Sequence, residues 1–149
     1  MTWGFDMTTA SAPMHVPASR TGYLLTGAAA SVAHLLMMIP GYREDGSFQT
    51  TDWLVVLLIS LIVAGLLFTF VVPGGGAVTA LVLGIAALVS VLVFWAGITL
   101  PLAAAGAVTA WRVRASGDRS GMATAALALS VVAAVALVAI IVGDAVSSD

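Results

Sequence analysis

Apolar residues fill long, uninterrupted blocks of this chain, and short polar or glycine- and proline-rich stretches separate the blocks. Between Asp52 and Arg112 there is not one Asp, Glu, Lys or Arg. A transmembrane helix needs about 20 apolar residues to cross a hydrocarbon core about 30 Å thick, so this run holds at least two crossings. Residues 54–59 and 133–142 are apolar at every position instead of every second one, which favours helices over the strands of a β-barrel.

Three of the apolar blocks have clear ends. Pro40 and Gly41, a pair that stops helices, follow the first block. The second block begins after Asp52, a residue that caps helix N-termini well, and a proline- and glycine-rich turn at residues 73–76 ends it. These signals predict three membrane spans, at residues 22–39, 53–72 and 122–142.

The remaining block, residues 77–111, is too long for one crossing. As a single helix its 35 residues would measure about 52 Å, which exceeds the thickness of a bilayer even with tilt. Gly97 and Pro101 are the candidates for a break, because proline is tolerated in the first turn of a helix. We therefore expect a new helix to begin near Thr99 or Leu100.

Two arrangements follow from this break. In the first, residues 77–96 cross the membrane and residues 99–114 return as a short helix, which gives five spans. In the second, residues 77–99 cross once and the remainder lies along the membrane surface or projects from it, which gives four. The returning segment has no polar face suited to an interfacial helix, so the pattern favours five spans.

The predicted fold class is accordingly all-α, a polytopic transmembrane helical bundle over residues 21–143. Residues 1–20 contain Pro13 and Pro17 among scattered Ser and Thr, and we expect them to form a disordered polar tail. Residues 144–149 are predicted to form a short polar C-terminal tail.

Composition indicates that lipid is the solvent of this bundle. The chain is 61% hydrophobic and 8% charged, whereas a soluble domain has roughly a quarter of its residues charged. The absence of cysteine excludes disulfides and thiolate metal sites, and the small net charge of -2 without a basic patch argues against nucleic acid as a partner. All five basic residues are arginine, which together with the abundant Ala, Val and Gly suggests a GC-rich bacterial genome and hence a cytoplasmic membrane.

The arginines predict the orientation of the bundle. Arg112, Arg114 and Arg119 make the loop at residues 112–121 the most basic in the chain, so we expect it in the cytoplasm and the C-terminus outside. Arg20 joins this side in the five-span arrangement, whereas Arg43 does so in the four-span one. The charge rule therefore does not choose between the two arrangements.

The second half of the chain carries a series of motifs in a fixed order. They are Leu81-Val82-Leu83-Gly84-Ile85, a break with Phe94, Trp95 and Pro101, a basic Arg112-Val113-Arg114, and Gly121-Met122-Ala123. This series resembles a small membrane-domain family of unknown function that is common in actinobacteria. The resemblance covers residues 77–142, implies a helical hairpin followed by a final helix, and brings no catalytic residues.

His34 is the only histidine within a predicted span, and an ionisable residue in a membrane is a functional hypothesis by default. It could ligate a haem with Met37 or Met38 as the second axial ligand, or its neutral ring could simply bond to a neighbouring helix, which we favour. The acidic residues Asp52 and Asp144 sit at span ends, so no buried carboxylate supports proton-coupled transport or hydrolysis. We therefore predict no enzymatic activity, no cofactor and no metal site.

Small residues recur every four positions along several predicted spans. In lipid, such residues let helix backbones approach closely and gain van der Waals contact. The pattern indicates either packing within the bundle, which we favour, or a seam for another subunit. The residues of these predicted packing faces are Gly27 and Ser31, then Gly76, Ala80 and Gly84, and then Ala126, Ser130 and Ala134.

The leading hypothesis for function is a non-enzymatic integral membrane protein that works through helix–helix association. Its partners would be membrane lipid and either a protein subunit to which it is accessory or further copies of itself. The alternative is a small channel or transporter for an uncharged or lipid-like solute. A haem-binding electron carrier that uses His34 is a distant third.

Overall fold

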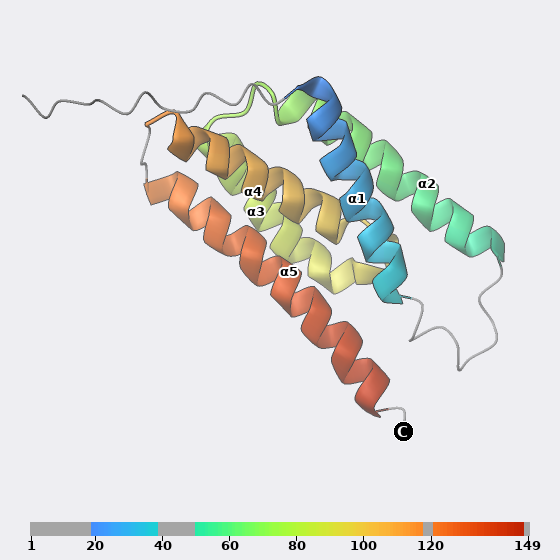
Figure 1. Ribbon diagram of the computed structural model, residues 1–149. Helices are drawn as coiled ribbons and strands as arrows, with labels where there is room; N and C mark the ends of the chain where they lie inside the picture. Colours follow the sequence, from blue (N-terminus) through green and yellow to red (C-terminus); the bar gives the residue numbers. More distant parts are fainter. Residues whose placement is uncertain (1–18, 39–49, 118–120, 148–149) are drawn as a thin grey trace, which may run out of the picture.

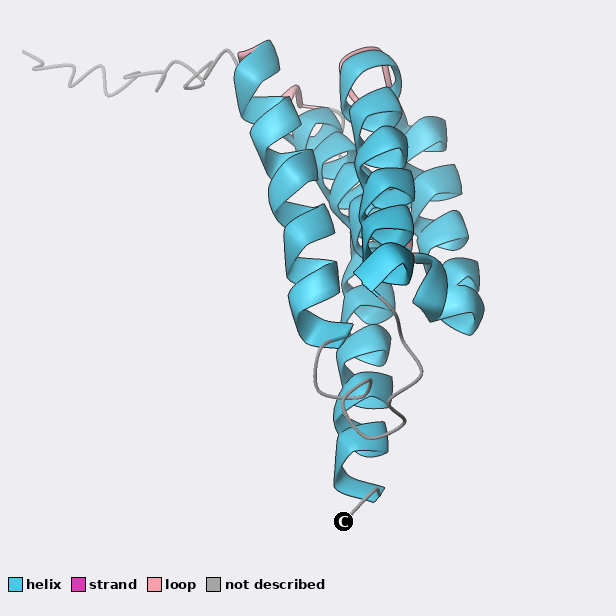
Figure 2. Cartoon of the chain, turned by 90° about the vertical axis from the view of Figure 1, so that its right-hand side faces the viewer, coloured by secondary structure: helices cyan, strands magenta, loops and turns pink. Residues whose placement is uncertain are grey.

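The computed structural model describes residues 19–38, 50–117 and 121–147. Within these ranges every regular element is a helix (Figure 2), so the predicted all-α fold class is confirmed. The five longest helices, labelled in Figure 1, are α1 (Arg20–Met38), α2 (Thr50–Leu66), α3 (Ala77–Ser90), α4 (Thr99–Ala115) and α5 (Gly121–Ser147). A π-helical segment, η1 (Leu67–Val71), continues α2, and a 3₁₀-helical segment, η2 (Val91–Ala96), continues α3.

Successive helices run antiparallel and pack into one bundle (Figure 1). Helices α3, α4 and α5 pack closely against one another, and α1 and α2 lie together beside α4. The start of α1, the turn after η1 and the end of α4 therefore meet at one end of the bundle. The end of α1, the start of α2 and the end of α5 point towards the other.

The charged residues that the structure describes are divided between these two ends. Arg20, Arg112 and Arg114 lie at the first end, which we call the arginine end. Asp52 and Asp144 lie towards the opposite end, which we call the acidic end. No described Arg, Lys, Asp or Glu side chain lies between the two groups along the helices. The middle of the bundle is therefore apolar apart from hydroxyl groups and the buried imidazole of His34.

The helices begin and end close to the predicted spans, with one clear difference at the C-terminus. Helix α5 continues through Ser147, whereas the polar tail was expected from residue 144. The hydroxyl of Ser147 lies within hydrogen-bond distance of the carbonyls of Gly143 and Asp144, at 2.9 and 3.1 Å, and so satisfies the helix end. Residues 1–18 of the predicted N-terminal tail, and the segments that carry Arg43 and Arg119, lie outside the described residues.

Three helical segments are long and apolar enough to cross a membrane by length and composition. They are Arg20–Met38, Asp52–Val71 and Gly121–Asp144, and they correspond to the three spans with clear ends in the sequence. The apolar segment Ala77–Val93 is shorter. Helix α4 has 17 residues, about 25 Å at 1.5 Å per residue, which is less than a hydrocarbon core of about 30 Å.

Helix α4 lies in the interior of the bundle rather than on its surface. It packs against α1, α3 and α5, and nearly half of its residues are buried. The buried positions are mostly small: Thr99, Pro101, Ala103, Ala105, Gly106, Thr109, Ala110 and Val113. They recur on several sides of α4, because neighbouring helices surround it.

The packing is inverted relative to that of a water-soluble bundle. Two of the three buried clusters consist almost entirely of alanine, for example Ala80, Ala110 and Ala126, which come from α3, α4 and α5. Large apolar side chains point outwards instead, with Phe70 exposed to 73% and Leu92 to 77%. Exposed apolar surface on this scale is a liability in water but is what lipid solvates.

The break predicted at Gly97 and Pro101 is present. Val93 leaves helical geometry with φ -122° and ψ 42°, and Gly97 adopts a left-handed conformation with φ 73°. A side chain at Gly97 would be strained at this φ and would also meet Val56, whose Cγ1 lies 2.8 Å from the position of a Cβ. Pro101 stands in the first turn of α4, where its missing N–H costs no hydrogen bond.

Candidate functional site

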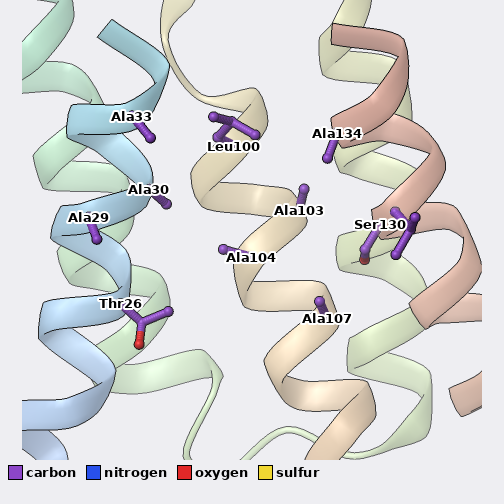
Figure 3. Close-up of a pocket in the computed structure, with 11 residues that line it drawn as sticks. Thr26, Ala29, Ala30, Ala33, Leu100, Ala103, Ala104, Ala107, Ser130 and Ala134 are labelled. Atoms are coloured by element: carbon purple, nitrogen blue, oxygen red, sulfur yellow. The ribbon is translucent and has the colours of Figure 1, made fainter. Parts of the chain in front are cut away.

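A groove with a volume of about 450 Å³ opens on the surface of the bundle between α1, α4 and α5. Figure 3 shows α4 as its floor and the two other helices as its walls. Seven of the 11 lining residues are alanine, and none is charged. The lining residues are Thr26, Ala29, Ala30 and Ala33 from α1, Leu100, Ala103, Ala104 and Ala107 from α4, and Ser130, Val131 and Ala134 from α5.

The small residues of this alanine-lined groove follow the helical repeat of each contributing helix. Ala29 and Ala33 lie four positions apart on α1, and Ala103 and Ala107 do so on α4. Residues at this spacing share one helix face. Each helix therefore presents a strip of methyl groups to the groove, with its backbone directly beneath them. The hydroxyl of Thr26 donates to the carbonyl of Gly22 on its own helix at 2.9 Å and adds little polarity.

Ser130 lines the α5 side of the groove and is exposed to only 2%. Its Oγ has no hydrogen-bond partner among the described residues. It lies 2.6 Å from the position that a Cβ on Gly106 would occupy, so only a glycine lets α4 approach α5 here. Gly106 also lies against α3, because its Cβ would be 3.2 Å from the backbone N of Gly84.

Helices α3, α4 and α5 pack together around Gly106, in a contact that we call the three-helix junction. Most of the predicted packing residues of α3 and α5 lie at or beside it. Ala80 and Ala126 are completely buried, and Gly84 is buried with a Cβ position only 3.0 Å from the carbonyl O of Ala126. Ala134 is half-buried and lines the groove. Gly76 is the exception, since it is the exposed N-cap of α3 and has nothing within 4 Å of its Cβ position.

The predicted pair on α1 faces α2 and η1. A Cβ on Gly27 would lie 2.7 Å from Cδ2 of Phe68, so the aromatic ring sits against bare backbone. Ser31 is completely buried, and its Oγ donates to the carbonyl of Gly27 at 3.1 Å. Phe68 is itself 1% exposed and belongs to η1, the π-helical segment.

His34 lies on the same buried face of α1 as Gly27, Ser31 and Met38, and it is completely buried. It does not line the alanine-lined groove. The imidazole therefore offers no accessible surface to a haem unless the surrounding helices repack. Within the described ranges no group of three or more His, Cys, Asp or Glu side chains is arranged to hold a metal ion.

Buried hydroxyl groups gather around the break between α3 and α4. The Oγ of Ser60 on α2 donates to the carbonyl of Gly97 at 2.7 Å. The Oγ1 of Thr99 donates to the carbonyl of Ser90 at 3.0 Å, and the Oγ of Ser90 lies 2.7 Å from the carbonyl of Ala87. These hydroxyl groups satisfy carbonyls that the broken helix leaves without an intrahelical partner.

At the arginine end, Arg112 joins three elements. Its guanidinium donates to the carbonyl of Val72, the C-cap of η1, and, at 3.1 Å, to that of Pro73 in the turn that follows. It also lies over the ring of Tyr23 on α1, 5.6 Å from the centroid, in cation–π geometry. Arg112, one of the arginines from which the orientation is predicted, thus also links α4 to the end of η1 and to α1.

Sequence reasoning missed Gly106 as a packing residue. Gly106 could have been found, because Gly106-Ala107-Val108-Thr109-Ala110 repeats residues 76–80 letter for letter. Ser60 has a hydroxyl group within a predicted span, where such groups can form interhelical hydrogen bonds. Its partner Gly97 lies 37 positions away and could not be predicted from the sequence.

No family model, curated protein or solved structure matches this chain. The resemblance of residues 77–142 to a small membrane-domain family thus stays a prediction. Any functional conclusion must come from the geometry of the bundle itself.

Proposed function

We propose that this protein is a non-enzymatic integral membrane protein that acts through helix–helix association, as an accessory subunit or as a homo-oligomer. The alanine-lined groove between α1, α4 and α5 is the observation that carries the proposal. A transmembrane helix that docks there would approach the backbones of three helices, and close approach is what stabilises helix pairs in lipid. Ser130 and Ala134, two of the predicted packing residues, belong to this groove.

The proposed location is the bacterial cytoplasmic membrane, with the arginine end in the cytoplasm and the C-terminus outside. Arg112 and Arg114 support this orientation because basic residues accumulate on the cytoplasmic side. The interior position of α4 supports the arrangement in which this helix lies within the bundle, as in the five-span prediction. In the four-span alternative α4 would leave the bundle and expose the residues that it buries.

Measuring the state of association of the purified protein tests the proposal. Ala104 is half-buried on the groove floor and packs beside the buried cluster that contains Phe68, so Ala104→Leu fills the groove from its floor. Ala139 is exposed elsewhere on α5 and provides the matched control, Ala139→Leu. In mild detergent or nanodiscs we expect the wild type and Ala139→Leu to form an oligomer or retain a stoichiometric partner, and Ala104→Leu to be monomeric. A wild-type protein that is monomeric and partner-free, or three identical samples, would overturn it.

A channel or transporter for an uncharged or lipid-like solute is the second candidate. It is favoured by one observation, the absence of any charged side chain among the residues that line the groove. Transfer of a fluorescent lipid or flux of an uncharged solute in proteoliposomes tests it. Transport would exceed that of protein-free liposomes and would fall in Ala104→Leu, whereas rates equal to protein-free liposomes would rule it out.

A further inference from the structure

The turn between α3 and α4 lies at an unexpected level along the bundle. Figure 1 shows it ending short of both the first turns of α2 and the C-terminal turns of α5. A helix pair that crosses a membrane completely would carry its turn to the same level as the ends of its neighbours. The depth of this turn can be measured along three helices, each anchored by contacts between named residues.

The first measurement follows α2 and α4 from the arginine end. The guanidinium of Arg112 holds the carbonyls of Val72 and Pro73, so these residues define one level. From there Asp52 is 20 residues away along η1 and α2, or about 30 Å, which matches the thickness of a hydrocarbon core. Thr99 is 13 residues from Arg112 along α4, or only about 20 Å.

The second measurement starts from the acidic end. Gly97 accepts the hydrogen bond of Ser60, so the tip of the hairpin is level with Ser60. Ser60 is 8 residues from Asp52, which amounts to about 12 Å along α2. In the first measurement the distances of Asp52 and Thr99 from the arginine end differ by about 10 Å, and the value of about 12 Å agrees with this difference.

The third measurement uses α5. Ala110 clusters with Ala126, and Ala103 clusters with Ala133, so the antiparallel register advances by seven residues on both helices. Continuing this register puts Thr99 level with Leu137, which is completely buried. Asp144 is 7 residues further along α5, or about 10 Å.

The chemistry of the tip fits a position inside hydrocarbon. Residues 91–98 contain no charged side chain, and the indole N–H of Trp95 is their one polar side-chain group. Leu92 and Trp95 are exposed to 77% and 54%. Non-helical backbone is tolerated at membrane depth only where it is buried in protein and its polar groups are satisfied. Gly97 meets both conditions, because it is buried and its carbonyl accepts from Ser60.

We propose that α3 and α4 form a re-entrant hairpin, which enters and leaves the membrane at the arginine end and whose tip at Gly97 stops about 10 Å short of the acidic end. The protein then has three complete crossings, α1, α2 and α5, which are the three segments long and apolar enough to span. Five helices fill about two-thirds of the membrane thickness from the arginine end, and three helices cross the remaining third. The inference rests on the proposed membrane location and changes the five-span topology only at the tip of α3 and α4.

Site-directed spin labelling in liposomes tests this depth. Because the chain has no cysteine, single labels can be attached to Leu92→Cys and Trp95→Cys at the tip and to Val146→Cys near the end of α5. All three positions are exposed on the protein surface, so burial does not hide the label. We expect dissolved oxygen, which concentrates in lipid, to relax both tip labels, and a water-soluble nickel chelate to relax only the label at position 146.

Two other results would overturn the re-entrant hairpin, and each points to a different topology. Tip labels that respond to the nickel chelate added on the same side as the label at Val146 would establish five complete crossings. Tip labels that respond on the side of a label at Ser116, beyond the end of α4, would establish the four-span arrangement. Neither result bears on association through the groove, which the Ala104→Leu comparison tests separately.

Discussion

Gly106 of α4 lies so close to Ser130 of α5 that any side chain at position 106 would disturb the contact between the two helices. A Cβ at position 106 would lie 2.6 Å from the Oγ of Ser130, well inside van der Waals contact. The serine Oγ has no hydrogen-bond partner among the described residues, so bare glycine backbone faces an unsatisfied hydroxyl group. The contact links the interior of the three-helix junction to the wall of the groove.

This contact predicts a strong energetic coupling between the two positions. Gly106→Ala should destabilise the protein by about 1–3 kcal/mol through overpacking, whereas Ser130→Ala should be close to neutral because it removes an unsatisfied hydroxyl. In the double variant the added methyl group gains room, so the loss should shrink by at least about 0.5 kcal/mol. Thermal unfolding of the four proteins in one detergent measures this coupling, and strictly additive changes would contradict the contact.

Gly84 predicts a cost for bulk between α3 and α5. A leucine would be driven into the carbonyl of Ala126 and the side chain of Leu129, whose atoms lie 3.0 and 3.2 Å from its Cβ position. We expect Gly84→Leu to lower stability by about 1–3 kcal/mol. Gly65→Leu is the control, because nothing lies within 4 Å of its Cβ position. Equal losses in the two variants would mean that the helix contact is not the cause.

Arg112 should not be replaceable by lysine. The planar guanidinium reaches two carbonyls and stacks over Tyr23, which a compact ammonium group does not do. We expect Arg112→Lys to lose about 1 kcal/mol or more, from a hydrogen bond and the stacking contact. Among the described residues the exposed Arg114 donates to the hydroxyl of Thr124 alone, at 3.3 Å, so Arg114→Lys should change stability little. Unfolding midpoints of the two variants test this difference. Identical midpoints would show that the contacts of Arg112 with the two carbonyls and Tyr23 do not stabilise the protein.

The tip of the hairpin predicts the consequence of losing a single hydroxyl group. Ser60→Ala leaves the buried carbonyl of Gly97 without its donor. Interhelical hydrogen bonds in membranes contribute about 0.6 kcal/mol on average and up to about 1.7, and we expect a value in the upper half of this range because the carbonyl is buried. Thr69→Ala on the exposed surface is the control. Chemical denaturation in mixed micelles should separate the two, and an unaffected Ser60→Ala would show that the tip does not depend on α2.

The sides of the membrane on which the turns lie can be tested with single cysteines in a chain that has none. Gly74 precedes α3, Ser116 follows α4, and both are exposed at the arginine end, whereas Ser147 is exposed at the end of α5. With a membrane-impermeant thiol reagent, we expect Ser147→Cys to label in intact cells. Gly74→Cys and Ser116→Cys should label only after the cells are opened. Opposite behaviour of Gly74→Cys and Ser116→Cys would mean that the chain crosses an odd number of times between them.

The sequence by itself determined the helices and most of the places where they end, with α5 as the exception because it continues through Ser147. Charge-free blocks that lack the alternating polar residues of barrel strands form helices in lipid, because a helix satisfies its backbone groups within its own segment. Glycine and proline act locally on the backbone, so the turn at residues 73–76 and the break near Gly97 could be located without knowledge of any neighbour. The arginine positions likewise predicted an orientation from charge alone.

Only the tertiary structure decided which small residues face one another and how deep each helix reaches. Gly76 and Gly84 share one helical spacing, yet Gly76 is an exposed cap and Gly84 lies against α5, because neighbours rather than periodicity determine contact. The depth of Gly97 depends on a hydrogen bond to Ser60, a residue 37 positions earlier. Spacing along the chain records the length and the faces of a helix, but the level at which a helix stops is a relation between helices and exists only in the folded bundle.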